Sequence, residues 1–111
     1  MANTFKLKTK AGVTTIATIY TCPSSTTTII IGCMVGNTTS ASVTATVTLV
    51  SDTSATETNQ DVELITNAPI PAGSSLELLS GNKVVMQATD VLKLTASGAC
   101  DIAASILEIT A

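Results

Sequence analysis

The sequence contains no histidine, arginine or tryptophan, and only one phenylalanine and one tyrosine. Histidine is the commonest general base and the usual activator of a serine nucleophile, so its absence argues against a hydrolase. The lack of arginine removes the side chain best suited to bidentate binding of carboxylate or phosphate. Scarce aromatics leave few stacking platforms for sugars or bases. We therefore expect a protein that is not an enzyme and has no catalytic residues, no cofactor and no metal.

Charge is also scarce, because charged residues make up 12% of the chain, about half the usual share. This indicates that partners cover much of the surface, although a free surface rich in Thr and Ser is the alternative. Lys6, Lys8 and Lys10 are spaced by two residues, which places them on one face of a strand. Without arginine or interleaved aromatics, this basic strip predicts a solvated strand face, and no nucleic acid is expected as a partner.

The three cysteines, Cys22, Cys33 and Cys100, show no CxxC spacing and have no histidine to complete a zinc site. Cys33 lies in an apolar run and is expected to be a buried free thiol. A Cys22–Cys100 disulfide is the alternative, although an odd number of thiols favours a reducing cytosol. The N-terminus lacks the apolar region of a signal peptide, and the apolar run at 29–35 is too short to span a bilayer, so no membrane partner is expected.

What the chain has in abundance is threonine (21) and serine (11), distributed with a period of two residues almost throughout. Helical spacing is not sustained anywhere. The fold class we predict is all-β, a single-domain antiparallel β-sandwich over residues 1–111, jelly-roll or Ig-like, with about eight strands. The strands are expected at residues 5–8, 13–21, 26–35, 42–50, 61–66, 75–79, 83–87, 90–96 and 100–110.

Several segments carry finer expectations. Residues 42–50 alternate cleanly between aliphatic and threonine positions, which predicts one core face and one hydroxylated face. Residues 26–35 are expected to be a central strand covered on both faces. Residues 80–82 predict a hairpin turn, and the prolines of 67–74 predict a connector at an edge or between sheets. The polar loop at 51–60 should be the most mobile part, and its acids predict a solvated loop rather than a calcium site.

The apolar surplus predicts contacts with other subunits. Three consecutive isoleucines must point to both sides of a sheet, so one face meets either a second layer or another protein. A strand edge rich in Thr and Ile also requires a cover. We therefore expect a homo-oligomer, with residues 1–10 as a contact arm. The candidate protein-contact residues are Phe5, Lys6, Leu7, Lys8, Ile29, Ile30 and Ile31.

Five segments, in this order and spacing, carry a resemblance to a known group of proteins. They are residues 1–6 (MANTFK), 20–28 (YTCPSSTTT), 69–76 (PIPAGSSL), 90–97 (DVLKLTAS) and 105–110 (SILEIT). Together they resemble small virion structural proteins of tailed bacteriophages, cyanophage-like ones in particular. The resemblance spans most of the chain but not the 51–60 loop, and each segment alone is unspecific.

This resemblance implies a non-enzymatic virion component, assembled in the cytoplasm of the host bacterium. The expected role is a capsid decoration or cement protein that stabilises the head, with the major capsid protein or other virion proteins as partners. The sequence has no coiled-coil stalk or fibre repeat, which favours the capsid. The alternatives are a neck or tail accessory protein, located in the collar, on the tail or at a fibre base, and a receptor- or carbohydrate-binding module, which the scarcity of aromatics disfavours.

Overall fold

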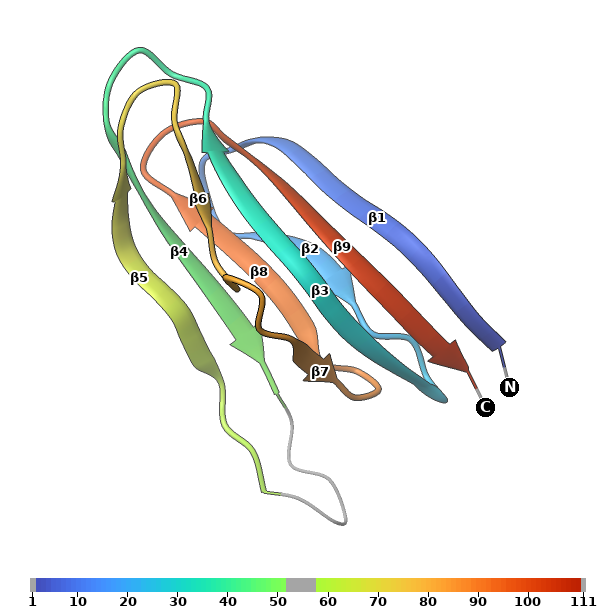
Figure 1. Cartoon of the computed structure of the whole chain (residues 1–111). Coiled ribbons are helices and arrows are strands. Elements are labelled where there is room, and N and C mark those ends of the chain that lie inside the picture. Colours follow the sequence, from blue (N-terminus) through green and yellow to red (C-terminus); the bar gives the residue numbers. More distant parts are fainter. Residues whose placement is uncertain (1, 52–57, 111) are drawn as a thin grey trace.

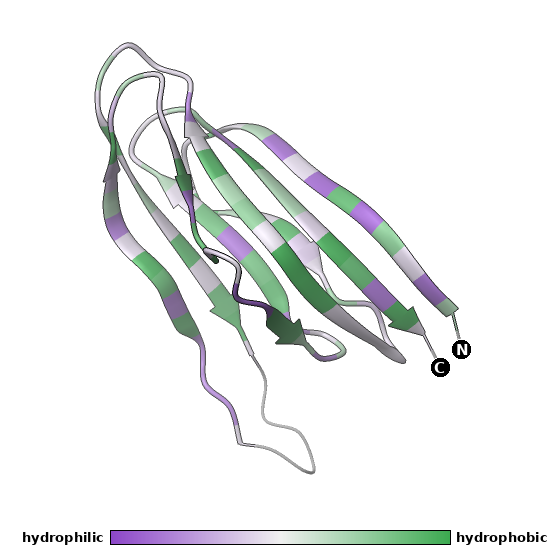
Figure 2. Cartoon of the chain, in the orientation of Figure 1, coloured by the Kyte–Doolittle hydropathy of each residue, from purple (hydrophilic) through white to green (hydrophobic). Residues whose placement is uncertain are grey.

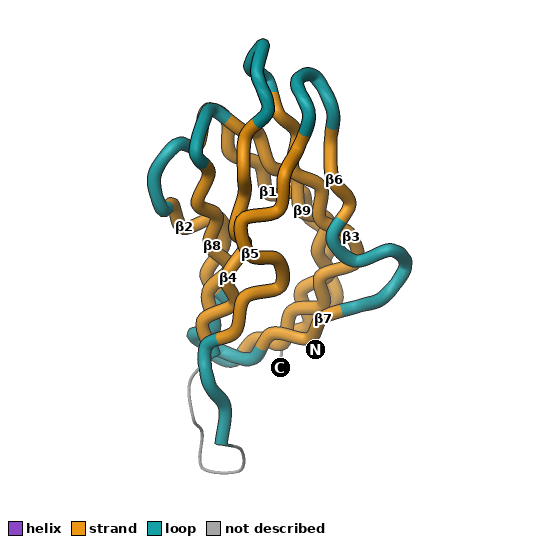
Figure 3. Tube along the Cα trace, turned by 90° about the vertical axis from the view of Figure 1, so that its left-hand side faces the viewer, coloured by secondary structure: helices purple, strands orange, loops and turns teal. Residues whose placement is uncertain are grey.

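The computed structural model describes residues 2–51 and 58–110 and forms two antiparallel sheets packed face to face (Figures 1 and 3). The described residues contain nine strands, so the predicted all-β sandwich is confirmed. The strands are β1 (Ala2–Val13), β2 (Ala17–Thr21), β3 (Thr26–Asn37), β4 (Val43–Val50), β5 (Val62–Ile70), β6 (Ser75–Glu77), β7 (Val84–Met86), β8 (Val91–Ala96) and β9 (Cys100–Thr110).

Sheet A has the order β1-β9-β3-β6, with β7 also paired to β3, and sheet B has the order β2-β8-β4-β5. The predicted hairpin around residues 80–82 is wrong, because β6 and β7 do not pair with each other. Both run antiparallel to β3, β6 against residues 34–36 and β7 against residues 28–30. They therefore act as one interrupted edge strand. Counted that way, the strand order is that of an eight-stranded jelly roll.

The core lies between the sheets and is built by alternate residues of each strand. The prediction for residues 42–50 is confirmed, because Val43, Ala45 and Val47 are buried while the threonines between them are half-buried on the outer face. Strand β9 obeys the same rule, with its even-numbered residues directed inward. The largest side chains of this core include Ile30, Ile70, Met86, Leu92, Leu94, Ile102 and Ile106.

One expectation about the sheet A strands was wrong. Strand β3 is central but is covered on its inner face only, because the other sheet packs against one side and nothing in the described chain packs against the other; Ile31 and Met34 stay 37% and 46% exposed. Residues 2–10 pair with β9 without interruption from Ala2 to Lys10, so the segment expected as a contact arm is the edge strand of sheet A, and its role in contact stays a prediction. This pairing also places the two ends of the described chain side by side (Figure 1).

The proline-bracketed segment partly belongs to a strand, because β5 continues through Pro69 to Ile70. Strand β5 is the edge of sheet B, where a residue without an N–H is tolerated. Most of the predicted mobile loop, including Asp52 and Glu57, lies outside the described residues. No helix in the described part of the chain is long and apolar enough to cross a membrane.

Candidate functional site: the outer face of sheet A

Strand β1 carries its apolar side chains on the solvent side. Its register with β9 pairs Lys6 with the buried Ile106, and Phe5 with Leu107 on the opposite face. Lys6, Lys8 and Lys10 therefore point to the inner side of the sheet, whereas Phe5 and Leu7 point outward. Phe5 is 74% exposed and Leu7 is 64% exposed. The alternation of hydrophilic and hydrophobic residues along β1 is visible in Figure 2. An edge strand with this orientation leaves its apolar side unpartnered within the subunit.

The outward apolar residues form a continuous row across the sheet. Phe5 of β1 lies opposite Leu107 of β9, Leu107 opposite Ile29 of β3, and Ile29 opposite Val85 of β7. We call this row of four residues the ridge. It crosses the whole width of sheet A, and its end residues are its most exposed members.

A β-bulge widens the apolar area. The register between β3 and β9 shifts between Ile30 and Gly32, which makes Ile31 the extra residue and turns it toward solvent. Five of the seven large apolar side chains that are exposed in the described residues belong to the outer face of sheet A. These five are Phe5, Leu7, Ile31, Met34 and Val85. The outer face of sheet B is different, because β4 presents threonines there. The two outer faces of the sandwich are therefore chemically distinct.

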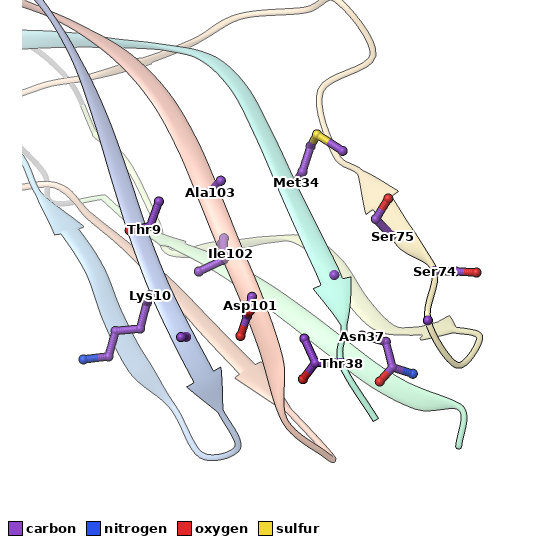
Figure 4. A pocket seen from close by; sticks show the side chains of 13 residues that line it. Thr9, Lys10, Met34, Asn37, Thr38, Ser74, Ser75, Asp101, Ile102 and Ala103 are labelled. Carbon is purple, nitrogen blue, oxygen red and sulfur yellow. The ribbon is translucent and has the colours of Figure 1, made fainter. Parts of the chain in front are cut away.

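The same face contains a hollow at the end opposite the ridge. It measures about 520 Å³ and is lined by residues from β1, β3, β6, β9 and the segments next to them (Figure 4). Gly36 and Ala103 contribute little side-chain volume, while Met34, Thr9 and Ser75 form its walls. The lining has few charges and no paired acid and base. The ridge and the hollow therefore lie at opposite ends of one sheet face.

On the inner side of the sheet, the ridge end of β1 is held by a polar cluster. Lys6 Nζ lies 2.8 Å from Glu108 Oε1, and the other carboxylate oxygen of the buried Glu108 accepts a hydrogen bond from the Tyr20 hydroxyl. That hydroxyl also lies 2.8 Å from Thr28 Oγ1, and Lys8 Nζ stacks over the Tyr20 ring at 5.8 Å from its centroid. These contacts connect β1, β2, β3 and β9, and they fix the orientation of β1 that exposes its apolar side.

The electrostatics of this cluster are those of a structural link. The hydrogen bonds from Lys6 and Tyr20 lower the pKa of Glu108 from its ordinary value of 4.5. Burial, together with the hydrogen bond to Glu108, raises the pKa of Tyr20 far above its ordinary value of 10.0. Both shifts keep the carboxylate charged and the phenol protonated at neutral pH, so the cluster holds no group ready to accept or release a proton.

The cysteines lie inside the sandwich as free thiols. Burial raises the pKa of Cys33 to about 11, and desolvation also raises the pKa of Cys22 and of Cys100. Cys22 lies 3.3 Å from Thr28, whose partner in β9 is Glu108, eight residues from Cys100. At about 3.3 Å per strand residue the two thiols are roughly 26 Å apart, which rules out the Cys22–Cys100 bridge within one subunit. Among the described residues, no group of His, Cys, Asp and Glu could hold a metal ion.

The predicted contact residues divide into two groups. Phe5, Leu7, Ile29 and Ile31 lie on the outer face of sheet A, as a contact surface requires. Lys6, Lys8 and Ile30 point to the inner side of the sheet, where Ile30 is 1% exposed, whereas the Lys6 side chain at the sheet edge stays 43% exposed. Sequence reasoning missed Val85 and Leu107, because only the strand register brings them beside Phe5 and Ile29, and it missed the exposed Met34 further along β3.

The comparisons with known proteins add little. No family model matches the chain, and no curated protein matches it. A solved structure described as "Bacillus endospore appendages form a novel family of disulfide-linked pili" superposes with a TM-score of 0.49 and 15% identity, covering 98% of this chain and 87% of the other. A likeness of this degree carries no conclusion about function.

Proposed function

We propose that this protein is a non-enzymatic structural component of a bacteriophage virion. It assembles in the cytoplasm of the host bacterium and serves as a capsid decoration protein that stabilises the head. The observation that carries the proposal is the apolar outer face of sheet A, which needs a cover in the working state of the protein. The resemblance of five sequence segments to small phage virion proteins supplies the context.

The stabilising effect of such a subunit follows from the apolar area that it buries against its partners. Apolar surface removed from water contributes about 25 cal/mol per Å², so a contact of a few hundred Å² per copy adds up over many copies of a shell. Such a subunit works through shape and burial and needs no side chain with a functional pKa. The outer face of sheet A meets this requirement, because its exposed residues are contiguous and the face is held rigid by three paired long strands, β1, β9 and β3.

The jelly roll alone does not select this role, because cupins and lectins share the architecture. Cupin-type metal chemistry relies on histidine ligands, and the full sequence contains none. Sugar sites commonly use aromatic platforms. Tyr20 is buried in the core, and Phe5 stands in the ridge beside aliphatic residues. An assembly role is what the residues of this chain support best.

The deciding experiment is quantitative mass spectrometry of purified virions, referenced to the major capsid protein and combined with an icosahedral reconstruction. Hundreds of copies in the shell lattice are expected. A few copies outside the symmetric shell would overturn the decoration role in favour of a neck or tail accessory. Absence from particles would overturn the virion proposal altogether.

A matched pair of variants tests whether the outer face of sheet A is the contact. Val85, in the ridge, and Val62, on β5, are 58% and 48% exposed, so Val85→Ser and Val62→Ser make the same change at similar depth. Val85→Ser should lower the occupancy of particles severalfold, whereas Val62→Ser should leave it unchanged. Equal occupancy for both variants would contradict the use of this face.

A further inference from the structure

We propose that the outer face of sheet A is covered by the same face of a second copy, which makes the protein an isologous dimer. The inference deepens the proposed function, on which it rests for the reason why this face requires a cover. It names the first partner of the face as this chain itself, ahead of any other virion protein.

The first argument is self-complementary shape. The ridge of Phe5, Leu107, Ile29 and Val85 crosses one end of the face, and the hollow occupies the other end. Along β9 the ridge residue Leu107 and the hollow residue Ala103 are four residues apart, which is about 13 Å. A face with a ridge and a hollow at opposite ends can pack against its own copy when the copy is turned end for end.

The symmetry that achieves this is a two-fold axis lying in the interface and crossing the strands near Ala104. Such an axis reverses strand direction but keeps strand order, so β3 of one copy lies over β3 of the other. Ile29 then lies over Gly36 of the second copy, where no side chain fills the space, and a Cβ built on Gly36 would meet nothing within 4 Å. Each copy gives a ridge and receives one, as an isologous interface requires.

Charge supports the same arrangement. Glu77 pairs with Met34 at one margin of the face, and the exposed Lys83 directly precedes Val84, the partner of Ile30, at the same margin. Lys83 and Glu77 thus lie a few residues apart along β3, on either side of the proposed axis. The axis brings Lys83 of each copy to Glu77 of the other. Within the described residues neither side chain makes an ion pair in its own subunit.

The area is also adequate. Four strand positions at about 4.8 Å spacing and a 12-residue strand of about 40 Å span on the order of 750 Å². A stable interface of standard size buries about 800 Å² per partner, so the face matches the requirement of a dimer.

The edge of β1 is a poorer route to self-association. Pairing β1 of two copies edge to edge would extend the row of Lys6, Lys8 and Lys10 with three more lysines on the same inner face. Inward lysines on an edge strand oppose such pairing, and charge repulsion would add to this effect. Face-to-face packing avoids these lysines, because they point to the other side of the sheet.

The test is sedimentation equilibrium of the purified full chain. We expect a monomer–dimer equilibrium that Val85→Asp shifts to monomer and that the matched Val62→Asp leaves unchanged. Thermal unfolding followed by far-UV circular dichroism verifies that both variants fold. A monomer at every accessible concentration would overturn the inference, and so would a dimer insensitive to Val85→Asp.

A charge exchange tests the symmetry with variants that leave the apolar face intact. Lys83→Glu and Glu77→Lys should each raise the dissociation constant about 5- to 30-fold, and the double variant should restore it to within a few-fold of the wild type. Additive weakening in the double variant would overturn the proposed axis. Virions that contain the protein while the pure chain stays monomeric would reject the dimer and leave the proposed function standing.

Discussion

Phe5 and Lys6 are neighbours in the chain that lie on opposite faces of β1, and each occupies the side where its character is least expected. Lys6 points to the inner side of the sheet, 2.8 Å from Glu108, while Phe5 is 74% exposed to solvent. The ion pair and the register with β9 specify this orientation together. A shift of one residue would bury Phe5 and expose the lysines, so the polar cluster selects the register that creates the apolar ridge.

The first prediction concerns Glu108. Glu108→Gln keeps the shape of the side chain but removes the charge that Lys6 neutralises, and it should destabilise the fold by about 1–3 kcal/mol at pH 7. Because the pKa of Glu108 is lowered in the folded state, its stabilisation is present above the ordinary value of 4.5 and is lost as the pH falls through the folded value. The difference between wild type and variant should therefore vanish in acid.

Urea unfolding followed by circular dichroism from pH 7 to pH 2 measures this difference. Glu63→Gln, at an exposed position of sheet B away from the proposed dimer face, serves as the control and should cost less than about 0.5 kcal/mol at pH 7. A constant difference between wild type and Glu108→Gln over the whole pH range would show that the charge of Glu108 is not what stabilises the register.

The second prediction concerns the thiols. Cys22, Cys33 and Cys100 are buried, and burial raises the pKa of each, to about 11 for Cys33. At pH 7 the native protein should react with N-ethylmaleimide at least about a hundredfold more slowly than Val62→Cys, which presents a thiol on β5, 48% exposed and outside the proposed dimer face. Mass spectrometry should count three added groups after unfolding. Rapid labelling of a native cysteine, or fewer than three free thiols, would contradict a buried interior that contains no disulfide.

Local patterns were enough to predict the strands whose two faces differ. Residues 42–50, 90–96 and 100–110 alternate between aliphatic and polar or small side chains, and each forms one strand at nearly those bounds. The sandwich follows from them, because half-buried strands without helices must pack sheet on sheet. The count of about eight strands is close to the nine in the described chain.

The ridge could not be predicted in the same way, because it depends on pairings between distant segments. Spacing by two places Lys6 with Lys8 and Phe5 with Leu7, but only the register with β9 decides which pair points inward. The predicted hairpin around residue 81 failed for the same reason. Two short apolar runs flanking a Ser-Gly-Asn turn fit a hairpin locally, yet both runs pair with β3, far away in the chain.

The third prediction concerns Gly98, in the turn between β8 and β9. A Cβ at this position would lie 2.6 Å from Cγ1 of the buried Val43, so Gly98→Ala must displace a core side chain. We expect a loss of about 1–3 kcal/mol in the free energy of unfolding, measured by urea titration. Gly32→Ala is the control, since a Cβ there meets nothing within 4 Å.

The cause of that loss can be isolated by a double variant. Val43→Ala removes the atom that the new methyl group would meet, so Gly98→Ala should cost clearly less in the Val43→Ala background than in the wild type. Equal costs in the two backgrounds would assign the effect to the backbone of the turn instead of the contact with Val43.

The fourth prediction uses Tyr20 as its own spectroscopic probe, because it is the sole tyrosine and the chain has no tryptophan. Burial and the hydrogen bond to Glu108 raise its pKa far above the ordinary value of 10.0. The stabilisation by the protonated phenol is complete below pH 10 and is lost as the pH rises toward the folded value. Absorbance at 295 nm should therefore stay flat through pH 10 and rise only when circular dichroism reports unfolding.

Lys6→Met leaves Glu108 without its ammonium partner and should bring that joint transition to lower pH. A smooth tyrosinate titration centred near pH 10 in folded protein would show that Tyr20 is not part of the polar cluster that orients β1.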